Sequence, residues 1–302
     1  VAGRAAEAET CLRKAIGISP ESPAAHSLLG LVLIDLERLD EAEISCCQAL
    51  AADLGFGPGY VNLGTVLLAR TKPDEARDAF EAAVALEPAS APAYSGLSNA
   101  LRHLGRFGDA TDAAREAVAL AQEKASSHYN LGLACWENGK AADALSAFRR
   151  TLDLDPGLER ARFLVKTLSG EPCETVPREF VKAMYDTHAY RFDVNLVDEL
   201  QYQIPTDARE AVRDLWGDPD GRSWVIFDVG CGTGLCGPLF RDVATRLVGG
   251  DLSPNMIEKA RERGTHDELY AEDLTATLAR GDVDLVLATD VLIYVDDLRE
   301  TL

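Results

Sequence analysis

The residues with the clearest potential for ligand chemistry lie between Trp224 and Gly234, in the sequence WVIFDVGCGTG. Residues 224–227 are apolar and form a run long enough for one buried strand of a parallel sheet. Asp228 ends this run, and glycine follows at positions 230, 232 and 234. Because glycine has no side chain, such a turn lets the backbone approach a ligand where a strand passes into a helix. The pattern therefore predicts a cofactor site at the end of a strand, with a helix over residues 235–243 after it.

A second acidic residue follows the next predicted strand. Residues 246–250 are largely apolar and end in Asp251, 17 positions after Gly234. A carboxylate at this distance can accept hydrogen bonds from both hydroxyls of a ribose. Ser253 and Pro254 then predict the start of a helix, since serine is a good cap and proline fits the first turn. The short segment 268–270 predicts a third strand and residues 283–288 a fourth.

These positions resemble class I S-adenosylmethionine-dependent methyltransferases, whose first motif has an acidic residue followed by alternating glycines. The resemblance implies a Rossmann-like α/β domain and S-adenosylmethionine as cofactor, with methyl transfer from a sulfonium to a nucleophile. It implies that Asp228 and the glycine turn hold the methionine part, that Asp251 holds the ribose, and that Asp273 lies near the adenine. The full set that it implies for the cofactor is Asp228, Gly230, Gly232, Gly234, Asp251, Leu252, Met256, Asp273, Leu274 and Asp290.

A nicotinamide dinucleotide domain is the main alternative. Residues 232–237 satisfy the pattern GxGxxG, and Asp251 suits either nucleoside. The carboxylate of Asp228 favours a cationic methionine group, because it would repel a pyrophosphate. The later Asp273–Leu274 and Asp290 positions also fit the methyltransferase plan, so S-adenosylmethionine is the cofactor that we predict.

The first half of the chain repeats itself every 34 residues. This step links Leu29–Gly30 with Leu63–Gly64, Leu97–Ser98 and Leu131–Gly132. Three further sets of positions keep the same register, namely Ala42, Ala76, Ala110 and Ala144; Cys46, Phe80, Ala114 and Phe148; and Ala49, Ala83, Ala117 and Thr151. The pattern resembles tetratricopeptide repeats, which are stacked pairs of antiparallel helices. We expect a half repeat, four full repeats and a capping helix over residues 1–168, and a methyltransferase domain with N-terminal lid helices over residues 178–302.

The repeats predict a scaffold for a protein or peptide whose identity the sequence does not reveal. First-helix positions that line the groove in this family are mostly small or apolar, with Arg102 as their single arginine. Tyr129 and Trp136 suit either a peptide anchor or helix packing.

The block from Tyr185 to Pro205 resembles the segment before the catalytic domain in bacterial methyltransferases that also carry these repeats. In related enzymes such helices cover the cofactor, so Tyr185 and His188 are lid candidates, although His188 fits a solvated helix position equally well. If methyl transfer needs a general base, the candidates are Asp290, His188 and Tyr294, and the sequence does not rank them. We predict no metal site.

Composition narrows the classes of partner. The 302 residues carry 50 acidic and 30 basic side chains, a net charge of −20, which argues against a nucleic-acid backbone as partner. No apolar run approaches the ~18 residues of a membrane-spanning helix. The seven cysteines include no CxxC pair, and this favours reduced thiols in the cytoplasm.

Two functions stay open at this point. The first is an S-adenosylmethionine-dependent methyltransferase, acting on a small molecule or a protein, whose repeats recruit the substrate. The second is a repeat-based scaffold protein with a non-catalytic methyltransferase-like domain. The class I fold has seven strands in the order 3-2-1-4-5-7-6, and four are predicted here. We therefore expect a fragment that binds the cofactor weakly or not at all unless the chain is completed.

Overall fold

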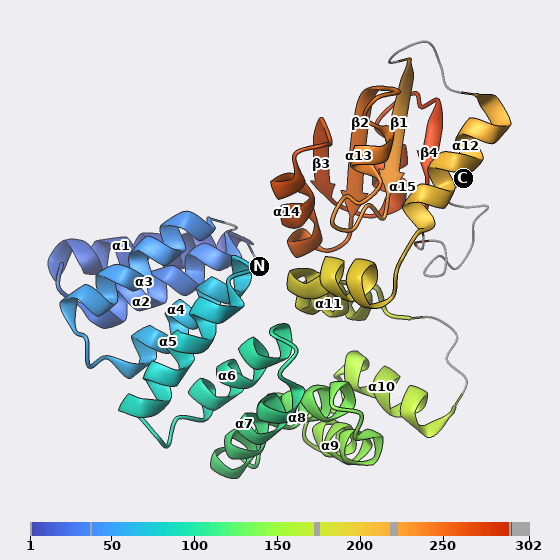
Figure 1. The fold of residues 1–302 in the computed structure, drawn as a ribbon. Coiled ribbons are helices and arrows are strands. Elements are labelled where there is room, and N and C mark those ends of the chain that lie inside the picture. Colours follow the sequence, from blue (N-terminus) through green and yellow to red (C-terminus); the bar gives the residue numbers. More distant parts are fainter. Residues whose placement is uncertain (1, 37, 172–175, 218–222, 290, 292–302) are drawn as a thin grey trace. The chain divides into compact units, whose positions relative to one another are not determined.

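The computed structural model describes residues 2–36, 38–171, 176–217, 223–289 and 291. The chain divides into two compact units, Val1–Cys173 and Glu174–Leu302. The described part of the first unit is helical, and that of the second contains a four-stranded parallel sheet with helices (Figure 1).

The first unit is a stack of helix pairs, as the 34-residue period predicts (Figure 1). Helix α1 (Ala2–Ile18) comes before the pairs, and α10 (Glu159–Ser169) follows them. The four pairs are α2 (Pro23–Asp35) with α3 (Leu39–Ala52), α4 (Gly57–Ala69) with α5 (Pro73–Leu86), α6 (Ala91–His103) with α7 (Phe107–Leu120), and α8 (Ala125–Glu137) with α9 (Ala141–Leu154). These ten helices lie in the range for which a half repeat, four full repeats and a capping helix were expected.

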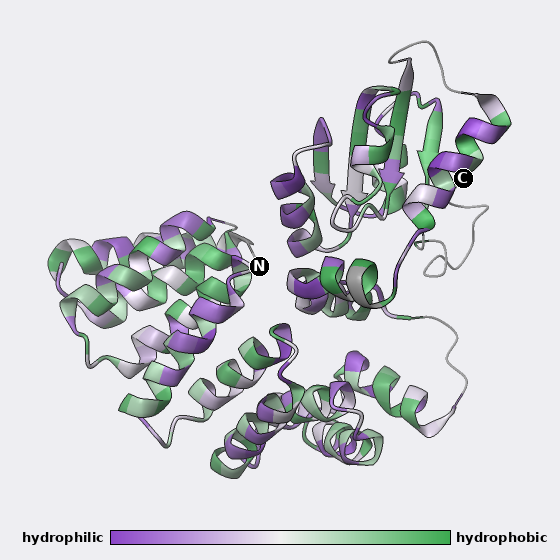
Figure 2. Ribbon diagram, in the orientation of Figure 1, coloured by the Kyte–Doolittle hydropathy of each residue, from purple (hydrophilic) through white to green (hydrophobic). Residues whose placement is uncertain are grey.

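The repeated positions form the core of this unit. All twelve second-helix positions that share the 34-residue register are buried. A Cβ added at Gly64 would lie 2.7 Å from Cζ of Phe80, so the glycine makes room for the ring of the second helix. In the third repeat Ser98 replaces the glycine, and its hydroxyl donates to the carbonyl of Ala110 at 2.8 Å. The helices accordingly carry both hydrophobic and hydrophilic residues along their length (Figure 2).

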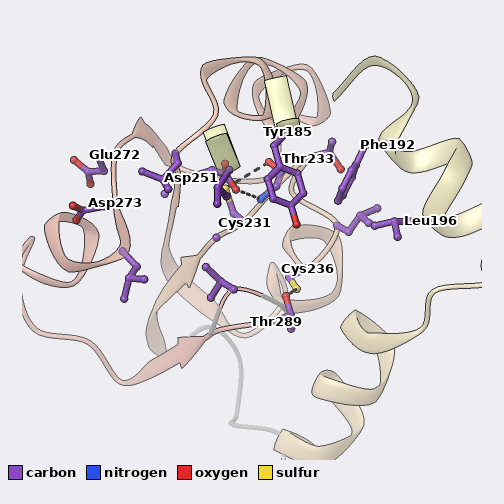
Figure 3. Close-up of a pocket in the computed structure, with 18 of the residues that line it drawn as sticks. Tyr185, Phe192, Leu196, Cys231, Thr233, Cys236, Asp251, Glu272, Asp273 and Thr289 are labelled. Atoms are coloured by element: carbon purple, nitrogen blue, oxygen red, sulfur yellow. Dashed lines mark hydrogen bonds between the residues drawn. The ribbon is translucent and has the colours of Figure 1, made fainter. Parts of the chain in front are cut away.

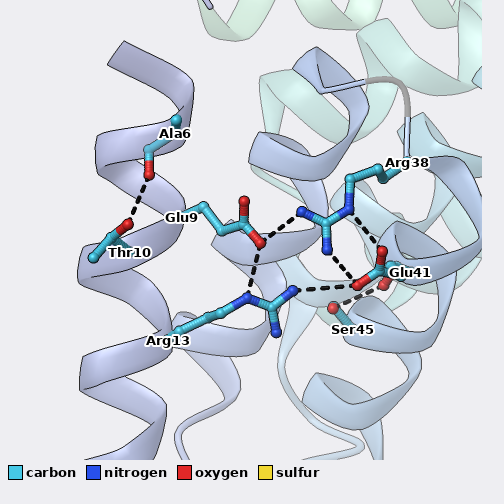
Figure 4. Close-up of polar contacts among 7 residues, drawn as sticks. All are labelled: Ala6, Glu9, Thr10, Arg13, Arg38, Glu41 and Ser45. Carbon is cyan, nitrogen blue, oxygen red and sulfur yellow. Dashed lines mark hydrogen bonds and ion pairs between the residues drawn. The ribbon is translucent and has the colours of Figure 1, made fainter. Parts of the chain in front are cut away.

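A polar network attaches α1 to the next pair (Figure 4). Glu9 accepts hydrogen bonds from Nε of Arg13 at 2.8 Å and from Nη1 of Arg38 at 2.7 Å. Arg38 precedes α3 and also donates to Glu41 at 2.6 Å. The hydrogen bonds from Arg13 and Arg38 lower the pKa of Glu9. These are surface pairs, so their contribution to stability is small and falls with salt.

Two side chains expected in the groove have partners within the first unit. Arg102 donates from Nε and Nη2 to Glu137 at 2.8 and 2.5 Å, and both side chains are more than 90% buried. The ring of Tyr129 packs on Phe148, with 5.7 Å between centroids, and the guanidinium of Arg160 lies 5.5 Å from its centroid. Arg102 is thus neutralised, and Tyr129 has a packing role whatever else it contacts.

The second unit begins with helical segments that precede the sheet. These are α11 (Arg178–His188), the 3₁₀ turn η1 (Ala189–Arg191), the π-helical segment η2 (Val194–Glu199) and α12 (Ile204–Trp216). The strands are β1 (Trp224–Val229), β2 (Ala244–Asp251), β3 (Glu268–Ala271) and β4 (Leu285–Leu287). All are parallel, in the order β3-β2-β1-β4, which matches the start of the class I order.

Helices cover both faces of this sheet. On one face Ile226, Leu247 and Leu287 pack with α12 and with α13 (Gly237–Phe240). On the other face Phe227, Val229 and Val248 pack with α15 (Leu274–Leu278). Helix α14 (Pro254–Arg263) contacts β2 and β3. In the part of the chain described here, no helix has the length and apolar character needed to cross a membrane.

The prediction of a helix over 235–243 was wrong in extent. The helix is only α13, because the turn continues through Cys236 and Pro238 takes the first helical turn, where its missing N–H is tolerated.

Candidate cofactor-binding site

The glycine turn lies between the ends of β1 and β2. The N–H groups of Gly230 and Cys231 donate to the carbonyl of Gly250 at 2.8 and 3.1 Å. Gly230, Gly232 and Gly234 have φ angles of +68°, +53° and +80°, which favour glycine strongly. A Cβ at Gly230 would also lie 2.5 Å from Cβ of Val291. The turn therefore needs glycine for both its conformation and its packing.

Asp251 joins this turn to the end of β2. Its Oδ2 accepts the N–H of Gly232 at 3.0 Å, and its Oδ1 accepts the N–H of Ser253 at 2.8 Å. The pKa of Asp251 is raised to about 6, chiefly by burial. The nearby carboxylates of Asp228 and Asp186 contribute to this rise, and the N–H groups of Ser253 and Gly232 oppose it. Each oxygen has room for a second donor, so the carboxylate can accept further hydrogen bonds from a ligand.

Asp228 lies deeper than Asp251. Neither its side chain nor that of His266 has exposed area, and Nε2 of His266 is 3.1 Å from Oδ2 of Asp228. Oδ1 of Asp228 is buried and has no hydrogen-bond partner among the described residues. The pairing with His266 is absent from the sequence-based prediction.

The end of β3 supplies a third acidic residue. Asp273 caps α15, with Oδ1 accepting the N–H of Ala276 at 2.9 Å and the hydroxyl of Thr275 at 2.5 Å. Arg178 of α11 donates to its Oδ2 at 2.9 Å. The hydrogen bonds from Thr275 and Ala276 lower the pKa of Asp273. This carboxylate is thus ionised and fixed in place at neutral pH.

Two carboxylates hold the segment 178–199 against the sheet domain. Asp186 accepts the hydroxyl of Ser253 at 2.5 Å and the N–H of Asn255 at 3.3 Å. Burial raises the pKa of Asp186. Asp193 accepts from the hydroxyl of Thr233 in the glycine turn and from Arg263 of α14. Both carboxylates of this segment therefore contact the elements that surround Asp251.

These elements enclose a cavity of about 430 Å³ within the second unit (Figure 3). Glu272 and Asp273 lie at one end, while Phe192 and Leu196 lie at the other (Figure 3). The rings of Tyr185 and Phe192 meet edge to face, with 6.0 Å between centroids. The cavity thus has an acidic end and an apolar end, with Asp251 between them.

The sequence-predicted residues separate into three groups in this structure. The cavity is lined by Tyr185, Gly230, Gly232, Asp251, Leu252, Asp273 and Leu274. Asp228, Gly234, Met256 and His188 are placed elsewhere: Asp228 and Met256 are fully buried, Gly234 adjoins the ring of His266, and His188 ends α11. Asp290 and Tyr294 lie outside the described residues.

Several lining residues were missed. Arg178, Phe192, Leu196, Thr233 and Glu272 all contribute to the cavity wall. Thr233 and Glu272 adjoin predicted positions, and this proximity was a usable signal. Arg178 and Leu196 reach the cavity from the segment 178–199, and no spacing rule points to them.

The fold and the cavity define a helical-repeat protein with a Rossmann-like domain of the methyltransferase type. Comparison with known families agrees. Residues 1–58, 61–125 and 106–159 match the tetratricopeptide repeat, and residues 227–302 match a methyltransferase domain. The repeat matches span more than half of the chain, so the protein belongs to the tetratricopeptide-repeat family, and it carries a methyltransferase domain.

Individual relatives are more distant. An 18S rRNA (guanine-N(7))-methyltransferase of Mus musculus is 28% identical over 106 residues, which cover 35% of this chain and 36% of that protein. The Bos taurus protein of the same description is 36% identical over 90 residues, covering 30% and 31%. The chain thus spans about a third of the length of the curated relatives it matches.

Among solved structures, a thermophilic tetratricopeptide-repeat protein of Thermus thermophilus is similar with a TM-score of 0.50 and 19% identity. The match covers 55% of this chain and 91% of that one. At this identity the likeness concerns the fold alone.

Proposed function

We propose that the protein transfers a methyl group from S-adenosylmethionine to a small-molecule or protein acceptor. The observation that carries this proposal is the hydrogen bond between Gly232 and Asp251. It brings the glycine turn and the acidic end of β2 together on one cavity wall. In a class I methyltransferase these two features are expected to hold the methionine part and the ribose of the same molecule.

The residues present fit this cofactor. Gly230 and Gly232 bring bare backbone to the cavity wall, and the carboxylate of Asp251 beside them has acceptor capacity left for ribose hydroxyls. A cavity of about 430 Å³ falls within the range of roughly 300–1,000 Å³ typical of small-molecule sites. The family of the matched domain generally uses S-adenosylmethionine, which supports the same cofactor.

The chain's own residues would bind the cofactor, orient the acceptor and keep water out of the site. Asp251 would accept the ribose hydroxyls, and Asp273 with Leu274 would border the adenine. The lid residues Tyr185 and Phe192 would cover the reacting end and keep water out. The cofactor, when bound, supplies an already activated methyl group. Alignment of the acceptor is therefore the main task left to the protein.

The apolar end of the cavity is our proposed acceptor site. Phe192 and Leu196 line it, whereas the charged lining residues of the whole cavity are three carboxylates and Arg178. The matched relatives act on 18S rRNA by their description. The net charge of −20 disfavours a phosphodiester backbone, and three of the four charged residues that line the cavity are carboxylates. We therefore favour an uncharged small molecule or a protein side chain over RNA.

The repeats would recruit or orient the acceptor, since helical repeats of this kind form extended binding surfaces. The second candidate is a scaffold protein whose methyltransferase-like domain does not catalyse. The buried and hydrogen-bonded Asp251 favours the enzyme, because an ionisable group of raised pKa beside a cavity is a feature of functional sites.

Transfer of a tritiated methyl group from S-adenosylmethionine tests the proposal. Protein that includes residues 1–302 is incubated with the protein, RNA and small-molecule fractions of a cell extract, beside an Asp251→Asn variant. We expect label in the protein or small-molecule fraction with wild type alone. Label in no fraction would favour the scaffold, and label in RNA would refute our choice of acceptor. The expectation that residues 1–302 bind weakly on their own stays a prediction, and titration of that chain tests it.

A further inference from the structure

The space beneath the glycine turn is occupied by the imidazole of His266, which follows α14 and precedes β3. A Cβ added at Gly234 or Gly237 would lie 3.2 or 2.9 Å from Cε1 of this ring. A Cβ at Gly249 of β2 would lie 3.0 Å from Cδ2. The ring is therefore packed between the glycine turn and the sheet, in the space that three glycines leave open.

The polar contacts of the ring form a short chain. Nε2 lies 3.1 Å from Oδ2 of Asp228, and Nδ1 lies 3.4 Å from the hydroxyl of Thr265. A neutral imidazole that donates from Nε2 to the carboxylate can accept from Thr265 at Nδ1. The His266 contact is the one side-chain hydrogen bond to the Asp228 carboxylate among the described residues, since Oδ1 has none.

A buried carboxylate with no donor is unfavourable and tends to become protonated or to move. Without His266, Asp228 would therefore lose the side-chain contact that orients its carboxylate. Asp228 comes two residues before Gly230, so a change in its position would reach the turn that lines the cavity.

We propose that His266 is a positioning residue of the cofactor site: through its Nε2–H it holds the carboxylate of Asp228 in a fixed orientation beneath the glycine turn. The inference rests on the proposed function, because it takes S-adenosylmethionine as the ligand of that turn. It differs from a purely structural role in one respect. The hydrogen-bond donor at Nε2 matters for affinity, and the volume of the ring alone does not suffice.

Two substitutions separate donor from volume. His266→Gln keeps an N–H donor at about the position of Nε2, whereas His266→Phe keeps an aromatic ring without a donor. Titration calorimetry with S-adenosylhomocysteine gives the dissociation constant of each variant, and circular dichroism confirms that each is folded. We expect His266→Gln to stay within about threefold of wild type and His266→Phe to weaken binding by at least about tenfold.

The double variant His266→Phe/Asp228→Asn adds a test of coupling. If His266 acts through Asp228, the double variant binds no more weakly than the weaker single variant. Should His266→Phe fail to fold, Asp228→Asn alone is expected to weaken binding with His266 intact.

The outcomes discriminate between the two proposals. Wild-type affinity in folded His266→Phe, wild-type affinity in Asp228→Asn, or equal losses in His266→Gln and His266→Phe would overturn the positioning role and leave the cofactor assignment standing. Absence of binding by the wild-type protein that includes residues 1–302 would instead overturn the proposed cofactor, and the positioning role with it.

Discussion

The carboxylate of Asp251 accepts the N–H of Gly232 at 3.0 Å, so the end of β2 and the glycine turn after β1 are fastened to each other. The same carboxylate accepts the N–H of Ser253, which begins α14. One side chain thus connects three elements around the cavity. Asp251 lines the cavity that we assign to the cofactor, and its carboxylate can still accept hydrogen bonds from a ligand there.

Replacement of Asp251 by asparagine should weaken cofactor binding by at least about tenfold. The amide retains one acceptor oxygen but loses the charge that strengthens hydrogen bonds from ribose hydroxyls. Calorimetric titration with S-adenosylhomocysteine measures the effect. The matched control is the same change at the exposed Asp282, which should leave affinity unchanged. Equal affinity in the two variants would remove Asp251 from the site.

Cofactor affinity should increase as the pH rises through about 6. The pKa of Asp251 is raised from 3.8 to about 6, chiefly by burial, and the ionised form is the better acceptor for ribose hydroxyls. The contribution of Asp251 to the free energy of unfolding follows the opposite trend with pH. This contribution is fully present below about pH 4 and is lost as the pH rises through 6.

Parallel titrations and thermal melts between pH 5 and 8 test this pair of trends. Asp251→Asn should show a weaker dependence on pH in both measurements, since its amide does not titrate in this range. An affinity of the wild type that is flat between these pH values would contradict the role of the Asp251 charge.

Gly230→Ala should abolish detectable cofactor binding. Its φ of +68° is unfavourable for alanine by about 1–2 kcal/mol, and the new Cβ would meet the side chain of Val291. The control is Gly108→Ala in α7, where the added Cβ meets no atom within 4 Å. That control should be neutral or slightly stabilising in a thermal melt, because alanine favours helix. A Gly230→Ala variant that binds normally would show that the turn is not part of the site.

Gly64→Ala should destabilise the repeats without altering the affinity of the cofactor site. The added Cβ would lie 2.7 Å from the ring of Phe80, which is fully buried, and overpacking of this kind costs about 1–3 kcal/mol. Chemical denaturation followed by circular dichroism gives the change in the free energy of unfolding. An unchanged midpoint would mean that Phe80 moves aside at little cost.

The helix pairs were predictable because each repeat has similar residue types at the same positions as its neighbours. Gly64 and Phe80, or Ala76 and Ala110, lie at fixed short separations, so periodicity alone identifies them. The glycine turn and Asp251 were predictable for a similar reason. Both belong to a local strand–turn–helix pattern, and the backbone conformation of this pattern restricts which residue types can occur at each position.

Contacts between distant segments were not predictable in this way. His266 is 38 residues from Asp228, and Asp193 is 70 residues from Arg263. No periodicity connects such pairs, and which histidine becomes buried depends on how α14 and the glycine turn pack. The length of α13 was also misjudged, because an apolar run after a glycine turn does not show where the turn ends.

The most direct test of the central claim compares the binding of two ligands, S-adenosylhomocysteine and NADH. Protein that includes residues 1–302 is titrated with S-adenosylhomocysteine and, separately, with NADH. We predict one molecule of S-adenosylhomocysteine per chain, displaced by S-adenosylmethionine and unaffected by NADH. Binding of NADH, or no heat of binding with S-adenosylhomocysteine, would contradict the assignment of this cavity.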